Sequence, residues 1–401
     1  MEKLYYENPY TKEFTAEIIN VIEKNNKYYV ELDKTYFYPE GGGQPSDTGY
    51  INSIPVTYVL EEDSKIYHVM DVKPLKIHRV KCNIDWEKRY DHMQQHLGQH
   101  ILSACLFKLF NANTIGFHLG KNFSTIDIDK LLSNDEINAS EKMANKIIFD
   151  NISVEILYPT NSELKKLPLR KISPKVNNQI RVVKIGDIDI NACCGTHPNS
   201  TIEVQIIKIS KYEKYKNGTR IEFLCGSRAV SDYTLKHDSI QKMSTILSCN
   251  ENSLISEVER LSGELNKALS EKAALKSEVA NYEIKEILDS CESIQNIKII
   301  KSIYYNVDLK YINLLASKLV SFPNVIALFG VKSNDKAQLI FMCSKELKIV
   351  SMNSLLKDAI TLIDGKGGGS NFSAQGGGKN NNNLESSVEY AYNKIKNLLI
   401  S

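Results

Sequence analysis

Two short segments of the chain carry side chains of the kinds that bind metal ions. The first, His96-Leu97-Gly98-Gln99-His100, holds two imidazoles four residues apart, and the second, Cys193-Cys194-Gly195-Thr196-His197, holds a thiol and an imidazole at the same spacing. Either segment alone could consist of ordinary structural side chains. Together they supply the nitrogen and sulfur donors that Zn²⁺ takes in proteins. They therefore predict one zinc site with four ligands, His96, His100, Cys193 and His197.

The ligand pairs need particular elements to position them. Residues 91–110 have the apolar spacing of a helix, in which side chains four apart share one face, so both imidazoles can point at one ion. The second segment follows a strand-like stretch and contains a glycine, which indicates a turn. His92 also precedes His96 by four residues, but three successive imidazoles do not easily serve one ion. We expect His92 not to be a ligand.

The composition excludes several classes of protein. With 401 residues, of which 42% are hydrophobic and 24% charged, the chain can fill more than one core. Its N-terminus is polar and tyrosine-rich, and no apolar run approaches the length of a membrane span, so we expect no signal peptide and no membrane partner. The eight cysteines include no CxxC motif and suit a reducing compartment better than a disulfide framework. We therefore expect a cytoplasmic protein.

Periodicity divides the chain into four parts of a predicted α+β protein. Residues 1–90 alternate like strands and predict a β-rich, barrel-like domain with a glycine-rich loop. Residues 91–248 mix helix and strand periods and form the predicted zinc-bearing domain, and residues 249–290 have the 4-3 apolar repeat of a coiled-coil arm. Residues 291–401 predict an α/β C-terminal domain. In the second part we expect helices at 134–150 and 228–247, and strands at 123–129, 154–158, 180–185, 202–209 and 221–225.

Glycine triplets occur at three places, residues 41–43, 367–369 and 376–378. Consecutive glycines let the backbone approach a ligand closely. In the C-terminal pair, exposed backbone N–H groups beside Lys366 and Lys379 could hold phosphate. The alternative is a flexible loop, which the asparagine run at 380–383 favours.

Basic residues gather on both sides of the Cys/His turn. Residues 164–184 hold seven basic residues and no acidic one, and residues 208–220 hold five against the single acid Glu213. Such segments could bind the phosphates of a polynucleotide near a metal site. A solvated lysine-rich surface is the alternative.

Taken in order, these motifs resemble those of the alanyl-tRNA editing proteins of the AlaX family, in their long form. That form is similar to the editing domain of alanyl-tRNA synthetase followed by the synthetase's DHH-associated C-terminal domain. The resemblance covers essentially the whole chain. It rests on the segments Phe37–Gly49, Asp91–Ser103, Gly116–Gly120 and Cys193–His197 and on the two C-terminal glycine triplets.

The resemblance implies a trans-editing hydrolase that removes wrongly attached serine, with glycine as a second candidate, from tRNA(Ala). It carries the family's zinc ligands onto His96, His100, Cys193 and His197. Cys194 stands where relatives often have glycine, so a ligand exchange between the two cysteines is an alternative. Zinc with an open position could polarise the ester carbonyl or lower the pKa of a bound water, whereas a closed site would position the substrate. Both modes stay open.

Selecting serine over alanine depends on one hydroxyl, which a buried hydrogen-bonding group can recognise. Gln99 and His118 lie where, by the resemblance, the synthetase editing domain contacts its substrate, and we expect them to be catalytic. Around the first glycine loop, the expected substrate-binding residues are Thr35, Gly42, Gly43 and Gln44. A structural hydrogen bond is the alternative for each polar candidate. Glu40 is the nearest acid in a matching motif, but nothing in the sequence makes it a general base.

The C-terminal part resembles a module that binds the body of the tRNA. The residues expected to do so are Lys366, Gly367, Gly368, Gly369, Gln375, Gly376, Gly377 and Gly378. A homodimer through the helical arm or the C-terminal domain is also expected.

Two other functions stay open, editing of Ser-tRNA(Thr) and a zinc-stabilised tRNA-binding protein without catalysis. A DHH-type phosphodiesterase is excluded, because such enzymes need aspartate-rich metal motifs and the chain has no DHH triplet.

Overall fold

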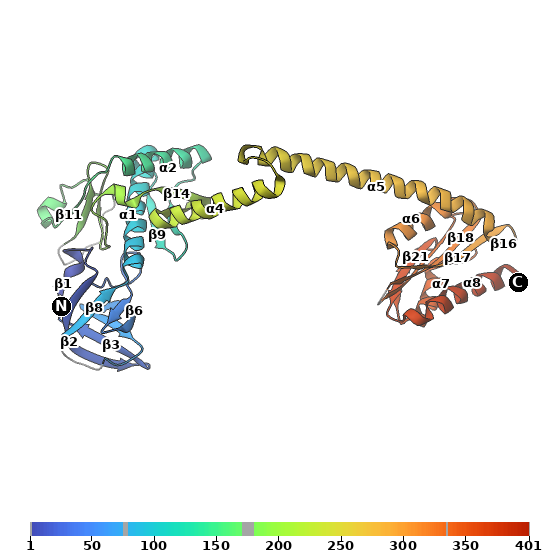
Figure 1. Ribbon diagram of the computed structural model, residues 1–401, viewed down its shortest axis with the longest axis horizontal. Coiled ribbons are helices and arrows are strands. Elements are labelled where there is room, and N and C mark those ends of the chain that lie inside the picture. Colours follow the sequence, from blue (N-terminus) through green and yellow to red (C-terminus); the bar gives the residue numbers. More distant parts are fainter. Residues whose placement is uncertain (1, 75–78, 171–179, 334–335, 401) are drawn as a thin grey trace. The chain divides into compact units, whose positions relative to one another are not determined.

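A computed structural model describes residues 2–74, 79–170, 180–333 and 336–400 and contains both helices and strands (Figure 1). The chain divides into unit 1, Met1–Ile246, and unit 2, Leu247–Ser401. Both units mix helices with sheets, which confirms the predicted α+β class. The finer division into four parts stays a prediction. No helix in the described part of the chain is both long enough and apolar enough to cross a membrane.

Six antiparallel strands of unit 1 close into a barrel in the order β2-β3-β7-β6-β5-β8. Successive side chains of a strand face opposite sides, and those that face inward form a buried cluster that includes Val30, Leu32 and Val59. The first glycine-rich loop, residues 36–48, lies between β4 and β5. The first eight strands are β1 (Glu2–Lys3), β2 (Glu13–Lys24), β3 (Lys27–Leu32), β4 (Lys34–Thr35), β5 (Gly49–Ile51), β6 (Ile54–Glu62), β7 (Lys65–Met70) and β8 (Arg79–Ile84).

The helix α1 (Trp86–Phe110) is the central element of unit 1 and runs from the barrel toward α2 (Asn134–Phe149) (Figure 1). It begins after the N-cap Asp85, whose side chain accepts a hydrogen bond from the backbone of Lys88. All of its residues from 92 to 106 are buried. Gly98 permits this close packing, because a Cβ there would lie 2.2 Å from the Cys225 sulfur.

Unit 1 also contains two antiparallel sheets, in the orders β14-β15-β10-β9 and β11-β12-β13, and the short parallel pair β1-β4. The strand expected at 202–209 begins only at Ile207, because Thr201–Val204 is a 3-10 helix that ends at Gln205, where φ is +63°. The remaining elements are β9 (Thr114–Leu119), β10 (Ser124–Ile128), β11 (Val154–Leu157), α3 (Asn161–Leu164), β12 (Val182–Ile185), β13 (Asp189–Ala192), β14 (Ile207–Tyr215), β15 (Gly218–Cys225) and α4 (Gly226–Leu247).

Unit 2 is built on one six-stranded sheet in the order β16-β17-β18-β19-β21-β20. Only the neighbours β17 and β18 are parallel, and α6 connects them. Buried apolar clusters cover both faces, one including α7 and α8 and the other including α6 and the end of α5. The elements are α5 (Leu254–Ser290), β16 (Glu292–Ile294), β17 (Ile297–Tyr305), α6 (Leu309–Leu319), β18 (Val325–Ser333), β19 (Lys336–Cys343), α7 (Met352–Ala359), β20 (Lys366–Gly369), β21 (Ser373–Gly378) and α8 (Leu384–Ile400).

The two C-terminal glycine triplets form the paired strands β20 and β21, so the flexible-loop alternative is wrong for these residues. The 3-10 helix Ile360–Ile363 packs directly on this hairpin. A Cβ on Gly376 would lie 2.3 Å from the Ile360 Cδ1, and one on Gly367 would lie 2.5 Å from the Gly376 Cα. The glycines therefore allow a close approach of the 3-10 helix to the sheet. Their role in tRNA binding stays a prediction.

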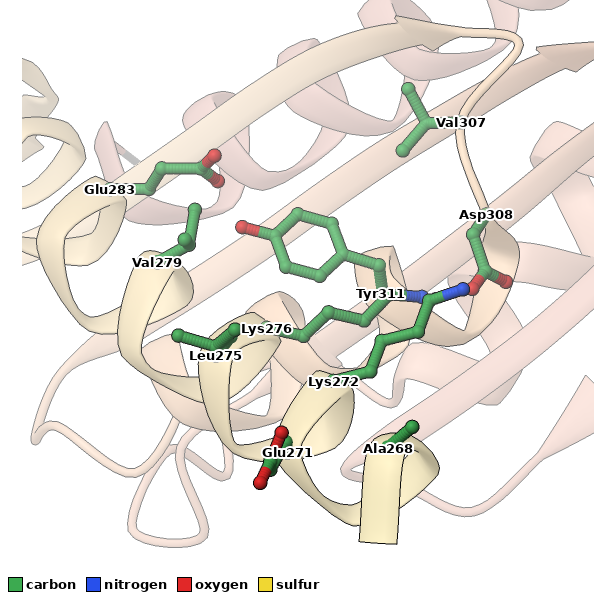
Figure 2. Close-up of a pocket in the computed structure, with 10 residues that line it drawn as sticks. All are labelled: Ala268, Glu271, Lys272, Leu275, Lys276, Val279, Glu283, Val307, Asp308 and Tyr311. Atoms are coloured by element: carbon green, nitrogen blue, oxygen red, sulfur yellow. The ribbon is translucent and has the colours of Figure 1, made fainter. Parts of the chain in front are cut away.

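The long helix α5 keeps much of its apolar stripe exposed. Its buried residues are Ala280 and Ile284, near the C-terminal end, whereas Val258 and Leu275 are 54% and 61% exposed. A groove of about 610 Å³ lies between α5 and the start of α6. Figure 2 shows Lys272 and Lys276 extending from α5 toward Asp308, and Lys276 Nζ bonds that carboxylate at 2.7 Å. A coiled-coil partner for this stripe stays a prediction.

One buried ion pair ties the first glycine-rich loop to α1. Arg89 and Asp47 both have fully buried side chains, and Arg89 Nε donates to the two carboxylate oxygens at 2.9 and 3.0 Å. The guanidinium also donates to the backbone carbonyls of Pro9, at 2.9 Å, and Tyr36, at 2.6 Å. Asp47 in turn accepts a hydrogen bond from the backbone N–H of Tyr38. The pair therefore fixes where the loop meets the helix.

We expect Asp47→Ala to lower the free energy of unfolding of unit 1 by about 3–5 kcal/mol, because it leaves a buried guanidinium without its charge partner. Urea unfolding followed by the fluorescence of Trp86, the one tryptophan of the chain, measures this change. Asp71→Ala is the matched control, because Asp71 pairs with Lys27 at the exposed surface and should shift the midpoint far less. Equal shifts for the two variants would contradict the prediction.

Candidate metal centre

Four side chains from two distant segments converge in unit 1. His96 and His100 project from α1, and Cys193 and His197 come from the turn that follows β13. One potential ligand atom from each residue lies within 4.8 Å of all the others. The Cys193 sulfur is 3.3 Å from His96 Nε2 and 3.5 Å from His197 Nε2. The structure thus brings together all four residues that the sequence predicts as ligands.

The spacing of these atoms fits a tetrahedral metal ion. Metal–sulfur and metal–nitrogen bonds of about 2.3 and 2.0 Å, as for Zn²⁺, place sulfur and nitrogen about 3.5 Å apart at a tetrahedral angle. His100 Nε2 is buried and has no hydrogen-bond partner among the described residues. A bound ion would satisfy this nitrogen. His92 and Cys194 are not members of the cluster.

Hydrogen bonds from outside the cluster orient both imidazoles of α1. His96 Nδ1 lies 3.0 Å from Gln44 Oε1, and His100 Nδ1 lies 3.0 Å from Asp189 Oδ2. When each Nδ1 donates to its oxygen, each Nε2 is left with its lone pair directed at the cluster. Arg170 Nε bonds the other oxygen of Asp189 at 2.8 Å. Burial alone would raise the pKa of Asp189, but the bonds from His100 and Arg170 hold it below its usual value.

The Cys/His turn is held by its neighbours on both sides. One Arg181 nitrogen donates to the backbone carbonyls of Cys193, at 2.8 Å, and Gly195, at 2.9 Å. Gln44 Nε2 donates to Thr196 Oγ1 at 2.9 Å. Glycine is required at 195, because a Cβ there would lie 2.2 Å from the His96 ring. These contacts fix the cysteine against the imidazoles of α1.

At Cys193 and His197 the electrostatics favour the protonation states that bind metal, whereas at His100 burial is outweighed by Cys193 and Asp189, which raise its pKa to about 9. Burial alone would raise the pKa of the Cys193 thiol, but the imidazoles of His96, His197 and His100 lower it well below its usual range. Burial also lowers the pKa of His197 to about 3. A thiolate and a neutral imidazole are the forms that act as metal ligands.

A cavity of about 180 Å³ opens beside the cluster. Its walls come from the glycine-rich loop, α1, β9 and β13. Of the predicted residues, it is lined by the ligands His96, His100 and Cys193 together with Gln99 and Gly42. The other lining residues are Thr114, Gly116, Phe117, Arg170, Asn191 and Ala192.

The other predicted residues of unit 1 lie outside this lining. Gly43 packs on Phe117, where a Cβ would come within 2.9 Å of the ring. Gln44 is buried and bonded to His96 and Thr196, and Thr35 is buried and bonded to His68 at 2.8 Å. His118 is exposed on β9. Their roles in substrate binding and catalysis stay predictions.

The basic segments near the turn are partly neutralised. Lys208 and Arg220 pair with Glu141 and Asp127 at 2.7 and 2.6 Å. Lys171 and Lys175 lie outside the described residues. Whether these segments bind phosphate stays a prediction.

Sequence reasoning missed Asp189 and Asn191, although the sequence contains a signal for both. Residues 189, 191 and 193 alternate along one strand and the turn that follows it. Alternate residues of a strand face the same side, so a cysteine ligand at 193 predicts that 189 and 191 point toward the same site. An acidic residue between two isoleucines, Ile188 and Ile190, strengthens that signal.

Two family models match the chain. "Threonyl and Alanyl tRNA synthetase second additional domain" matches residues 180–222, which include the Cys/His turn. "tRNA synthetases class II (A)" matches residues 2–88, which include the barrel.

Several proteins are similar to the chain over much of its length. It is 37% identical to the alanyl-tRNA editing protein AlaX-L of Pyrococcus horikoshii over 94% of each chain. It is 32% identical to the alanyl-tRNA editing protein Aarsd1 of Rattus norvegicus over 65% of this chain and 68% of that protein. It is 30% identical to the alanine–tRNA ligase of Methanobrevibacter smithii over 98% of this chain but only 45% of the ligase. The chain therefore spans less than half the length of the ligase.

We expect Asp189→Asn to weaken Zn²⁺ binding by about tenfold or more, because a neutral amide polarises and orients His100 less well than a carboxylate. Competition with a chromogenic chelator measures the affinity. Asp187→Asn is the matched control, because Asp187 is exposed and lies two residues away, in the turn that precedes β13. Equal affinities for the wild type and Asp189→Asn would show that the carboxylate does not support the site.

Proposed function

The chain belongs to the family of alanyl-tRNA editing proteins, and we propose that it is a trans-editing hydrolase that removes serine from Ser-tRNA(Ala), with Gly-tRNA(Ala) as a second substrate. The observation that carries this proposal is the His/Cys cluster in the wall of a small cavity. The names of the relatives support action on alanyl-tRNA. We place the activity in the cytoplasm, in keeping with a tRNA substrate and eight free cysteines.

We propose that the resident ion is Zn²⁺, held by His96, His100, Cys193 and His197. This donor set of three imidazoles and one thiolate is typical of zinc in proteins. When bound, the ion would supply a positive, Lewis-acidic centre beside the ester.

The cavity residues would bind and orient the reacting groups. A volume of about 180 Å³ suits a small aminoacyl group, with the terminal ribose remaining at the mouth beside Gly42. Gln99 Nε2 donates to Ser103 Oγ at 2.8 Å, which leaves the amide oxygen free to accept a hydrogen bond from the attacking water. The Arg170 guanidinium would stabilise the negative charge that develops on the ester carbonyl oxygen.

The remaining predicted residues would act around the cavity. Gln44 would position His96, and Thr35 would stabilise the barrel through His68. Gly43 lets the loop pack on Phe117. His118, exposed on the strand that lines the cavity, would contact the tRNA and not the ester.

We propose that the C-terminal glycine hairpin binds the tRNA body. β20 is the last strand of its sheet, so one side of its backbone N–H row is not used for pairing, and Lys366 is exposed on it. These groups suit phosphate oxygens. Gly367, Gly368, Gly369, Gln375, Gly376, Gly377 and Gly378 would shape this surface. Homodimerisation through α5 or the C-terminal domain would bring two such surfaces together.

We expect the purified protein to release serine from Ser-tRNA(Ala) and to leave Ala-tRNA(Ala) largely intact. His96→Ala should lower the release rate by about 100-fold or more, because it removes a ligand and its bond to Gln44. His237→Ala on α4, outside the cluster, is the matched control and should retain the wild-type rate.

The same assay separates the alternatives. Zinc-containing protein that binds tRNA but releases no amino acid would identify a binding protein without catalysis. Faster release from Ser-tRNA(Thr) than from Ser-tRNA(Ala) would assign the other editing function.

We expect Lys366→Glu to weaken tRNA binding by about 5- to 10-fold, because it replaces a phosphate-binding charge with a repulsive one. The single-turnover rate at saturating protein should stay unchanged, since Lys366 and the cavity belong to different units. Filter binding and single-turnover deacylation measure the two quantities. Lys310→Glu on α6 controls for a general effect of charge, and an equal loss of affinity in both variants would argue against a binding surface at β20.

A further inference from the structure

Two side chains that line the cavity have a buried polar atom without a hydrogen-bond partner among the described residues, His100, whose Nε2 belongs to the metal centre, and Asn191. Asn191 Oδ1 is buried and has no hydrogen-bond partner among the described residues. Three other polar side chains of the lining already make hydrogen bonds within the protein. Gln99 and Thr114 both donate to Ser103 Oγ, at 2.8 and 2.7 Å, and Arg170 is bonded to Asp189. A buried acceptor without a partner is unfavourable unless a ligand supplies the donor.

The strand β13 fixes the backbone position of Asn191. The backbone of Asn191 pairs with Val183 of β12 in an antiparallel register. Asn191 lies between Asp189, which orients His100, and Cys193, which belongs to the cluster. Because alternate strand residues share a face, all three belong to the side of the strand that faces the metal centre. Asn191 therefore lines the cavity beside the place where the ester would react.

An amide oxygen accepts hydrogen bonds and needs an O–H or N–H group from its ligand. A seryl ester offers two such groups, the side-chain hydroxyl and the α-amino group. The amino group is common to seryl, alanyl and glycyl esters, so a contact to it would not separate these substrates, whereas a contact to the hydroxyl would. The hydroxyl is neutral, and a neutral acceptor suits it.

We infer that Asn191 is a specificity-determining residue that accepts a hydrogen bond from the hydroxyl of the wrongly attached serine. This inference rests on the proposed editing function and adds the residue that recognises the substrate. An alanyl group in the cavity would leave Asn191 Oδ1 buried and unpaired, and sites of this kind reject substrates that lack the matching hydroxyl. The residues expected from the sequence to recognise serine, Thr35 and Gln44, already bond to His68 and His96.

Binding of two stable substrate analogues tests this inference without turnover. The probes are adenosine carrying serine through a 3′-amide and its alanyl counterpart, titrated into the zinc-loaded full-length protein by calorimetry. The wild type should prefer the seryl probe, and Asn191→Leu, which keeps the volume but removes the acceptor, should lower that preference by about tenfold or more. Asn113→Leu is the matched control, because the Asn113 side chain bonds Asp129 outside the cavity. It should keep the wild-type preference.

Asn191→Asp retains an acceptor oxygen and should retain the preference for serine. Zinc content and circular dichroism establish that each variant is folded. If Asn191→Leu does not fold, loss of the preference in folded, zinc-loaded Asn191→Asp would overturn the inference.

The remaining outcomes separate the inference from the proposed function. Release of serine from Ser-tRNA(Ala) by the wild type is measured in parallel. If the wild type releases serine but Asn191→Leu keeps the preference, or weakens both probes equally, the inference fails while the editing function stands. A wild type that releases serine without preferring the seryl probe also overturns the inference. A wild type that neither releases serine nor binds either probe overturns the proposed function and the inference with it.

Discussion

The complete burial of the middle of α1 is the constraint on which the rest of unit 1 depends. A helix enclosed on every side would ordinarily be apolar, yet this one carries histidines and glutamines through its buried stretch. Each of these polar groups needs a partner inside the protein. Gln95 exchanges hydrogen bonds with the backbone of Cys225, and Gln94 bonds the carbonyl of Glu203. The end of β15 and the 3-10 helix Thr201–Val204 are therefore bonded directly to the helix that they help to enclose.

The same requirement connects the barrel to the metal centre. The first glycine-rich loop reaches α1 at two points, with Asp47 paired to Arg89 and Gln44 bonded to His96. Gln44 also bonds Thr196 of the Cys/His turn, so one carboxamide joins the loop, the helix and the turn. The polar side chains of this glycine-rich loop therefore bond to α1 and to the Cys/His turn, although the sequence suggests that they bind a ligand.

The pairing of His96 with His100 could be predicted from the sequence, because side chains four residues apart in a helix lie on the same face. Cys193 and His197 could be predicted as partners from their residue types. The helix expected at 134–150 from periodicity is α2, and its start is fixed by a capping box of Ser133 and Glu136. The partners of the ligands were harder to predict. Asp189 lies 89 positions from His100, and only the folded chain shows that the two meet. The glycine strands were missed because glycine has no side chain to give a strand its alternating pattern.

The distance along the chain between the two halves of the metal centre has a consequence for folding. Cys193 and His96 are 97 positions apart, so an ion that joins them closes a long loop. Closing such a loop removes conformational freedom from the unfolded chain, and for a permanent cross-link over about 100 residues this is worth about 4.7 kcal/mol. A bound ion would therefore act as a reversible cross-link that stabilises the folded protein. The supply of metal in the cell would then influence how long a newly made chain persists, as well as whether it is active.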